Sequence, residues 1–107
     1  MVNIDKINKI KREEIKDILS NEDVIKYFDS IKVFGSCITD KCREDSDIDL
    51  FVSLKEEYIN DKDINDSYIQ LMLASSSDKD IFYAHEQKGE FNKKLYENMI
   101  NGIEVLK

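Results

Sequence analysis

Two acidic side chains and a Gly-Ser dipeptide within residues 35–50 have the types and the spacing suited to phosphoryl chemistry. Gly35 and Ser36 follow an apolar run, and after ten further residues Asp47 and Asp49 stand two positions apart. On a β-strand, side chains two positions apart point to the same face, so these carboxylates share one side of a sheet. Neighbouring carboxylates repel each other, and Mg²⁺ is typically held by one or two carboxylates together with substrate phosphates. The pattern therefore predicts metal-assisted phosphoryl or nucleotidyl transfer.

The Gly-Ser dipeptide supplies the phosphate side of such a site. Gly35 lets the backbone turn sharply and approach a ligand, and Ser36 adds a hydroxyl to backbone N–H groups that suit a phosphate. Taken alone, an Asp-x-Asp pair in an acidic chain is usually a solvated turn, and a lone Gly-Ser says less still. The functional interpretation is favoured because both motifs occur together, each attached to its own apolar run.

This stretch resembles the signature of the DNA polymerase beta-like nucleotidyltransferase superfamily, G-S-x10-D-x-D. The length of the chain resembles that of the minimal nucleotidyltransferase (MNT) members, and the resemblance extends over nearly the whole sequence. It implies a nucleotidyltransferase fold and a third acid on a later strand. That acid is Asp80 in Lys-Asp-Ile-Phe-Tyr, with Asp78 as the alternative.

One departure from the family pattern lies just after the Gly-Ser turn. Many members carry Arg and Gly where this chain has Thr39 and Asp40, so a basic contact near the triphosphate is missing. Lys41 and Arg43 lie close by in sequence and are alternative sources of positive charge. The missing arginine affects the expected affinity for the triphosphate, whereas the acidic residues of the predicted metal site are all present.

The resemblance also implies roles for individual residues. Two Mg²⁺ ions are expected as cofactors and ATP as the nucleotide substrate. The metal-binding and catalytic residues would be Asp47, Asp49 and Asp80, and the nucleotide-binding residues Gly35, Ser36 and Ser46.

The acceptor of the nucleotide is identified only by the same resemblance. The chain is similar to the MNT antitoxin of HEPN–MNT toxin–antitoxin pairs, which implies a protein adenylyltransferase that moves AMP from ATP onto a tyrosine of a HEPN-type toxin. One alternative is nucleotidylation of a small, aminoglycoside-like molecule by a homo-oligomer. The other is a non-catalytic module that neutralises its partner by contact.

Composition limits the remaining functional classes. The chain has 107 residues, 41% hydrophobic and 36% charged, which predicts one globular domain over 1–107. A net charge of −7 argues against nucleic acid as a partner, because phosphate contacts need clustered Lys and Arg. No apolar run approaches the roughly 20 residues that span a bilayer, so we expect no membrane association and a cytoplasmic location.

The two cysteines do not form a zinc motif. Cys37 and Cys42 lack a second cysteine pair, and the only histidine, His85, is distant in sequence. A structural zinc site needs four ligands, so small, partly buried free thiols are the expectation.

Hydrophobic periodicity predicts an α/β (α+β) fold, with a small mixed sheet of three to four strands and helices packed mainly on one face. The helix over 63–74 is expected to begin with Asp61 or Asp63 as its cap, and that over 22–28 with Ser20 or Asn21. The predicted helices are 4–19, 22–28, 63–74 and about 89–101, and the predicted strands are 31–34, 48–54, 79–83 and an edge strand at 103–106.

Overall fold

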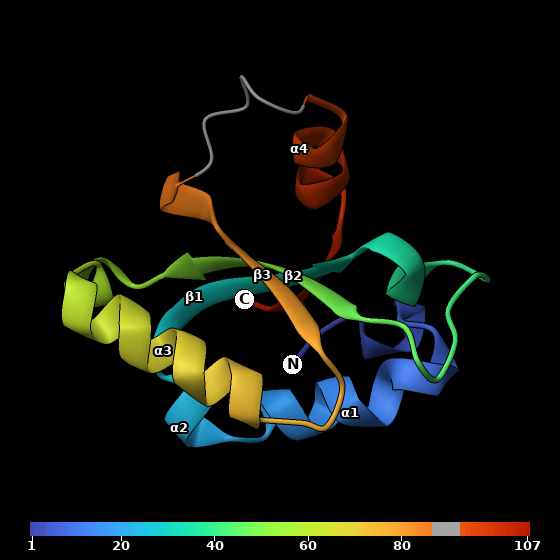
Figure 1. Ribbon diagram of the computed structural model, residues 1–107, viewed down its shortest axis with the longest axis horizontal. Helices are drawn as coiled ribbons and strands as arrows, with labels where there is room; N and C mark the ends of the chain where they lie inside the picture. Colours follow the sequence, from blue (N-terminus) through green and yellow to red (C-terminus); the bar gives the residue numbers. More distant parts are fainter. Residues whose placement is uncertain (87–92) are drawn as a thin grey trace.

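A four-stranded mixed sheet forms the centre of the protein in a computed structural model that describes residues 1–86 and 93–107 (Figure 1). The strand order is β3-β2-β1-β4, so β2 and β1 are the inner strands. β1 runs antiparallel to both β2 and β4, whereas β2 and β3 are parallel. The strands are β1 (Phe28–Phe34), β2 (Ile48–Leu54), β3 (Lys79–Tyr83) and β4 (Ile103–Leu106).

Helices cover the two faces of this sheet unequally. Among the residues that the structure describes, three helices lie together on one face, and α4 lies on the other (Figure 1). The first three are α1 (Lys9–Leu19), α2 (Glu22–Ile25) and α3 (Asp61–Leu73), and α4 is Lys93–Ile100. The predicted fold class, a small α+β domain with helices mainly on one face, is confirmed.

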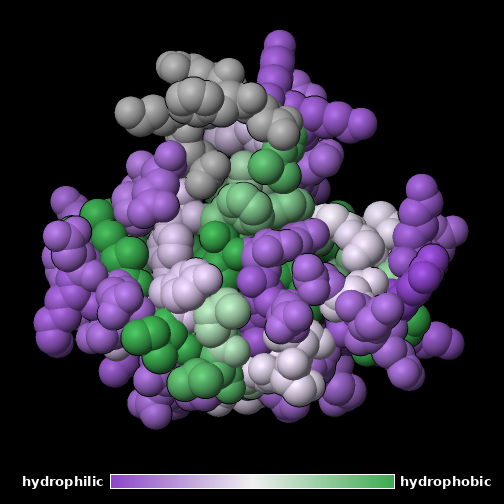
Figure 2. Space-filling view, viewed as in Figure 1, coloured by the Kyte–Doolittle hydropathy of each residue, from purple (hydrophilic) through white to green (hydrophobic). Residues whose placement is uncertain are grey.

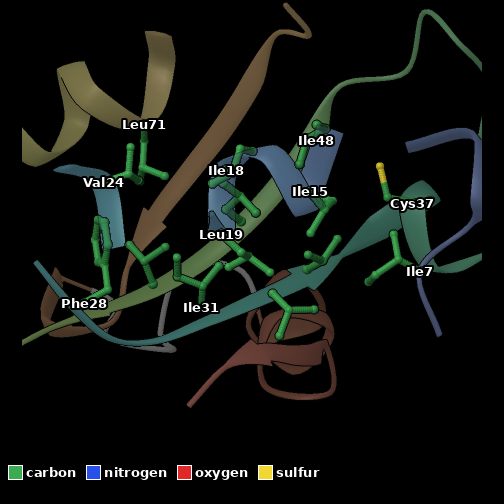
Figure 3. Packing of buried hydrophobic residues seen from close by; sticks show 14 of the residues in the cluster. Ile7, Ile15, Ile18, Leu19, Val24, Phe28, Ile31, Cys37, Ile48 and Leu71 are labelled. Carbon is green, nitrogen blue, oxygen red and sulfur yellow. The ribbon is translucent and has the colours of Figure 1, made fainter. Parts of the chain in front are cut away.

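The alternation of side chains along β2 separates the core from the opposite face. Ile48, Leu50 and Val52 are buried, and the residues between them are only partly buried. Figure 3 shows side chains of α1, α2 and α3 meeting those of the sheet in one apolar cluster. Asp49 therefore points away from this core, toward the face that carries α4.

The predicted strands agree with the structure more closely than the predicted helices do. The strands over 48–54, 79–83 and 103–106 have the predicted bounds, and β1 starts three residues earlier than the predicted 31 because buried Phe28 already belongs to it. The last helix is α4, and residues 89–92 of its predicted range lie outside the described residues.

Asparagines cap the first three α-helices, and α1 and α3 begin at other residues than predicted. The helix predicted over 4–19 is a 3₁₀ turn at Ile4–Lys6 followed by α1, with the Asn8 side chain accepting a hydrogen bond from Ile10 N at 3.0 Å. Neither Asp61 nor Asp63 caps α3, since Asn60 Oδ1 accepts the Asp63 N–H at 2.9 Å. Asn21 caps α2, one of the two predicted choices. That helix ends at Ile25, earlier than predicted, since the chain must enter β1 three residues later.

Two further expectations concern the cysteines and membranes. Cys37 and Cys42 are buried free thiols, as predicted. Within residues 1–86 and 93–107, every helix is too short or too polar to traverse a bilayer.

Candidate active site

The pairing of β2 with β3 brings two of the predicted acids face to face. In the parallel register of these strands, Asp49 lies directly opposite Asp80. Asp49 is half-buried and Asp80 is exposed at the edge of the sheet. The two carboxyl groups are close enough for Asp80 to raise the pKa of Asp49. The alternative acid, Asp78, precedes β3 and is not the partner of Asp49.

The electrostatics of Asp49 reflect this close pairing. Burial raises the pKa of Asp49 most, and the negative charge of Asp80 and the hydrogen bond to it raise the pKa further. The charge of Asp47 adds a smaller effect, and together these causes bring the pKa of Asp49 to about 6. Positive charge placed here, such as a divalent cation, would relieve the repulsion.

Gly35 lies against the carboxylate of Asp49. Its φ is +73°, in the region that favours glycine, and a Cβ built at this position would overlap with Asp49 Oδ2. Phe34, the residue before it, is the register partner of Asp49 on the other side of β2. The turn that follows is a 3₁₀ turn, Gly35–Ile38, closed by Thr39 N donating to Ser36 O at 3.0 Å. The Gly-Ser turn and the acid pair are thus adjacent, as nucleotidyl transfer chemistry requires.

A hollow of about 250 Å³ opens beside this turn, between the turn and α4. No lysine or arginine occurs among the described residues that line it, so the basic contact expected in the family has no counterpart there. Its side-chain hydrogen-bond donors are the amides of Asn98 and Asn101, since the Thr39 hydroxyl donates to Ser36 O at 2.9 Å. The lining residues are Gly35, Ile38, Thr39, Asn98 and Asn101.

Sequence reasoning did not identify Asn98 and Asn101. They reach the turn because α4 crosses the face of the sheet opposite to the core. Lys32 holds the end of that helix, since its Nζ donates to Ile100 O at 2.8 Å. No local signal in the sequence marks this crossing, because it is a tertiary arrangement.

Asp47 and Ser46 line a different hollow, of about 320 Å³, on the other side of the loop that precedes β2 (residues 39–47). Asp47 is exposed, and the Ser46 hydroxyl accepts the Arg43 N–H at 2.9 Å, which closes a turn within this loop. Asp78 lies on the wall of the same hollow. The structure therefore brings Asp49 and Asp80 together with Gly35, and places Ser46 with Asp47 at the margin.

Whether a metal ion fits this site depends on which side chains can act as its ligands. Within residues 1–86 and 93–107, no three His, Cys, Asp or Glu side chains converge closely enough to hold a metal as one group. Of the three acids expected from the sequence, Asp49 and Asp80 are register partners, and Asp47 is near enough for its charge to raise the pKa of Asp49. Two hard carboxylates fit Mg²⁺, which often takes its remaining ligands from substrate phosphates and water.

Cys37 stabilises the loop between the two motifs. Its thiol donates to Asp47 O at 3.4 Å, so it connects the end of the Gly-Ser turn with the start of β2. Burial first, and then the neighbouring Cys42, raise the pKa of Cys37 to about 12. A buried thiol of high pKa is unreactive, which indicates a structural role.

Two acids lie on adjacent strands of a mixed sheet, and a glycine turn contacts one of them. These features define an α+β domain suited to transfer of a phosphorus-containing group. The model of the family described as Polymerase beta, Nucleotidyltransferase matches residues 13–104. Because this match covers most of the chain, the protein belongs to that nucleotidyltransferase family, which supports a nucleotidyl-transferring activity. A comparison with curated proteins found no match.

Proposed function

We propose that this protein is an adenylyltransferase that moves AMP from ATP onto a hydroxyl of a second protein, a tyrosine of a HEPN-type toxin, and so acts as an antitoxin. The observation that carries the proposal is the register of Asp49 opposite Asp80 beside Gly35. Family membership supports transfer of a nucleotidyl group. The donor, the acceptor and the antitoxin role are parts of the proposal.

The nucleotide would enter along the Gly-Ser turn. Backbone N–H groups of Gly35 and Ser36 would bind the β- and γ-phosphates, and the amides of Asn98 and Asn101, which line the hollow beside the turn, would supply hydrogen bonds in place of the missing arginine. Amide donors carry no net charge, so they bind a triphosphate more weakly than an arginine does.

Asp49 and Asp80 would hold Mg²⁺, with Asp47 as a further ligand. The bound ion would neutralise the phosphates and lower the pKa of the acceptor hydroxyl. Asp49, half-buried and held between neighbouring strands, fixes the geometry of the site. Asp80 is exposed on the edge strand, so it meets an incoming acceptor and takes the proton of the hydroxyl.

The exposed surface of α3 favours a protein as the acceptor. Helix α3 packs beside β3 and exposes three large apolar side chains, Tyr68 (42% exposed), Ile69 (44%) and Leu73 (76%). Figure 2 shows apolar surface over the side of the molecule where α3 lies. Clustered apolar surface of this kind typically marks a protein contact, and a net charge of −7 suits a basic partner. The proposal accordingly treats 1–107 as a single catalytic domain in the cytoplasm that requires a second chain.

Two alternatives make different predictions. A small hydroxylated molecule, held by a homo-oligomer, would be modified without any toxin chain. A non-catalytic module would neutralise its partner by binding alone, and the absence of Lys and Arg among the described residues lining the Gly35 hollow is the observation in its favour.

The decisive experiment incubates the protein with ATP labelled on the α-phosphate, Mg²⁺ and the candidate toxin. Transfer predicts label on the toxin that disappears with Asp49→Asn. The matched control is Asp45→Asn, which removes an exposed carboxylate of the preceding loop and should leave labelling unchanged. Tight binding without label, together with full neutralisation by the Asp49→Asn variant, would establish the contact mechanism instead.

A further inference from the structure

Lys11 is a charged residue in the interior of the protein. It lies on α1 and is 1% exposed. Its Nζ donates to Glu44 O at 2.6 Å and to Ser77 Oγ at 2.7 Å, and lies 3.4 Å from Glu14 Oε2. A buried ammonium is tolerated only when its hydrogen bonds are satisfied, and here partners from three separate segments satisfy them.

Two of these segments lead into the strands that carry the acids. Glu44 belongs to the loop that precedes β2, and Ser77 belongs to the loop that precedes β3 (residues 74–78). Directly after this contact, Ile48 N donates to Asp78 O at 2.9 Å and begins the pairing of β2 with β3. Lys11 therefore joins the two loops immediately before the register that sets Asp49 opposite Asp80.

Glu14 completes the connection from the same helix. Its carboxylate accepts from Ser77 Oγ at 2.5 Å, Ser77 N at 3.2 Å and Ser76 Oγ at 3.1 Å. Burial raises the pKa of Glu14, but the hydrogen bonds from Ser77 and Ser76 and the charge of Lys11 outweigh it, so the pKa lies below its ordinary value. The Ser77 loop is thus held by an ionised pair on one turn of α1.

β3 depends on this connection more than the inner strands do. It is an edge strand, and β2 is its neighbour in the sheet. A shift at the start of β3 would move Asp80 relative to Asp49, because side chains follow the backbone register. The inner strand β2 is held on both sides, so the loop before β3 is the weaker of the two connections.

We infer that Lys11 is a positioning residue: by joining the loops that precede β2 and β3, it fixes the separation of Asp49 and Asp80 needed to hold a metal. The inference rests on the proposed function, because a metal held between these acids is part of that proposal. Lys11 itself touches neither acid, since its partners are Glu44, Ser77 and Glu14.

The test replaces Lys11 by methionine, which keeps the length of the side chain and removes the ammonium. The matched control is Ser67→Ala, the loss of another buried polar side chain. Ser67 Oγ donates to Ile64 O of its own helix at 2.7 Å and lies 2.8 Å from Tyr83 Oη, so these bonds involve neither the loop before β2 nor the loop before β3. Ser77→Ala is a milder variant that removes one Lys11 partner, for use if Lys11→Met does not fold.

Two measurements separate positioning from general destabilisation. In Lys11→Met, hydrogen exchange of the Ile48 amide should become about tenfold faster relative to amides in the middle of β1 and β2. The affinity for Mn²⁺, followed by electron paramagnetic resonance, should fall about tenfold, the effect expected when a group that orients metal ligands is lost. Ser67→Ala should keep both quantities within about twofold of wild type, even where it lowers the melting temperature as much.

The outcomes distinguish this inference from the proposed function. Wild-type Mn²⁺ affinity and Ile48 protection in Lys11→Met would overturn the positioning role and leave the proposed function standing. Equal losses in Lys11→Met and Ser67→Ala would overturn the positioning role as well, because the effect would then be general. Absence of Mn²⁺ binding in the wild-type protein would refute the proposed function and the positioning role together.

Discussion

Asp49 lies opposite Asp80 in the parallel pairing of β2 and β3, so two acidic side chains meet on one face of the sheet. Burial, and then the charge of Asp80, raise the pKa of Asp49 to about 6. At neutral pH the free protein therefore holds repelling charges that a bound cation would neutralise. The site is arranged for a ligand at the expense of the stability of the empty fold.

The first prediction is that Asp49→Asn stabilises the free protein at pH 7. The folded-state pKa of about 6 exceeds the ordinary value of 3.8, so the folded state binds more protons between these values. The stabilisation of the folded state by protonated Asp49 is fully present below pH 4 and is lost as the pH rises through 6. Because Asp49 is only half-buried, the expected gain is discounted to about 1 kcal/mol. Urea denaturation of both proteins at pH 4 and pH 7 measures the difference.

The pH dependence of this difference is the internal control. Wild type and Asp49→Asn should differ at pH 7 and converge toward pH 4, where both side chains are neutral. Asp45→Asn, which changes an exposed carboxylate of the loop before β2, should show no such convergence. A constant difference at both pH values would contradict the assigned cause.

The second prediction concerns metal. Mg²⁺ or Mn²⁺ at ten times the dissociation constant should stabilise the wild-type fold by about 1.4 kcal/mol, several degrees in melting temperature. Asp49→Asn and Asp80→Asn should abolish this increase, because each removes one of the paired ligands. Asp66→Asn on α3 is the control that retains it. An increase that survives in both site variants would show that the cation binds elsewhere.

The third prediction concerns the glycine of the turn. Gly35→Ala should lower stability by at least about 1–2 kcal/mol, the cost of the left-handed conformation at φ +73°. The overlap of the new Cβ with Asp49 adds to this cost. In an Asp49→Ala background that part should vanish, so Gly35→Ala should cost less there than in wild type. Equal costs in the two backgrounds would show that the overlap is relieved without involving Asp49.

The fourth prediction concerns the amides contributed by α4. Asn98→Ala should weaken ATP binding about two- to tenfold, the value of one hydrogen bond, with little change in stability. Asn65→Ala removes an equally exposed asparagine on α3 and should leave ATP affinity unchanged. Isothermal titration with ATP measures both. If the two variants bind ATP as wild type does, the hollow beside Gly35 is not where the phosphates lie.

Much of the sheet could be predicted because apolar and polar residues alternate along a strand and so indicate which side chains face the core. The alternation Ile48, Asp49, Leu50 sets one acid opposite the core, and the structure has this arrangement. The choice between Asp78 and Asp80 could not be made this way, because side chains two positions apart share a face in either case. Only the register, which pairs Asp80 with Asp49, separates them.

Tertiary arrangement determined the parts that the sequence did not reveal. Lysine is normally exposed, so no pattern predicted that Lys11 and Lys79 would be buried beside the loops that precede β2 and β3. The crossing of α4 over the outer face of the sheet, which brings Asn98 to the turn, depends on contacts between segments far apart in sequence. Phe82 is half-buried on that outer face, with its ring 5.7 Å from that of Phe34.

The last prediction separates the two acids of the Asp-x-Asp motif. Asp47 is exposed at the end of a loop, whereas Asp49 is half-buried between β1 and β3. Asp47→Asn should therefore change the free energy of unfolding by less than about 0.5 kcal/mol, while Asp49→Asn stabilises the fold as argued above. Both variants should lower nucleotidyl transfer at least tenfold, because each removes a carboxylate from the proposed metal site. Urea denaturation and the transfer assay, run on the same two preparations, test this separation of stability from activity. Full transfer by Asp47→Asn would restrict the metal site to the Asp49–Asp80 pair.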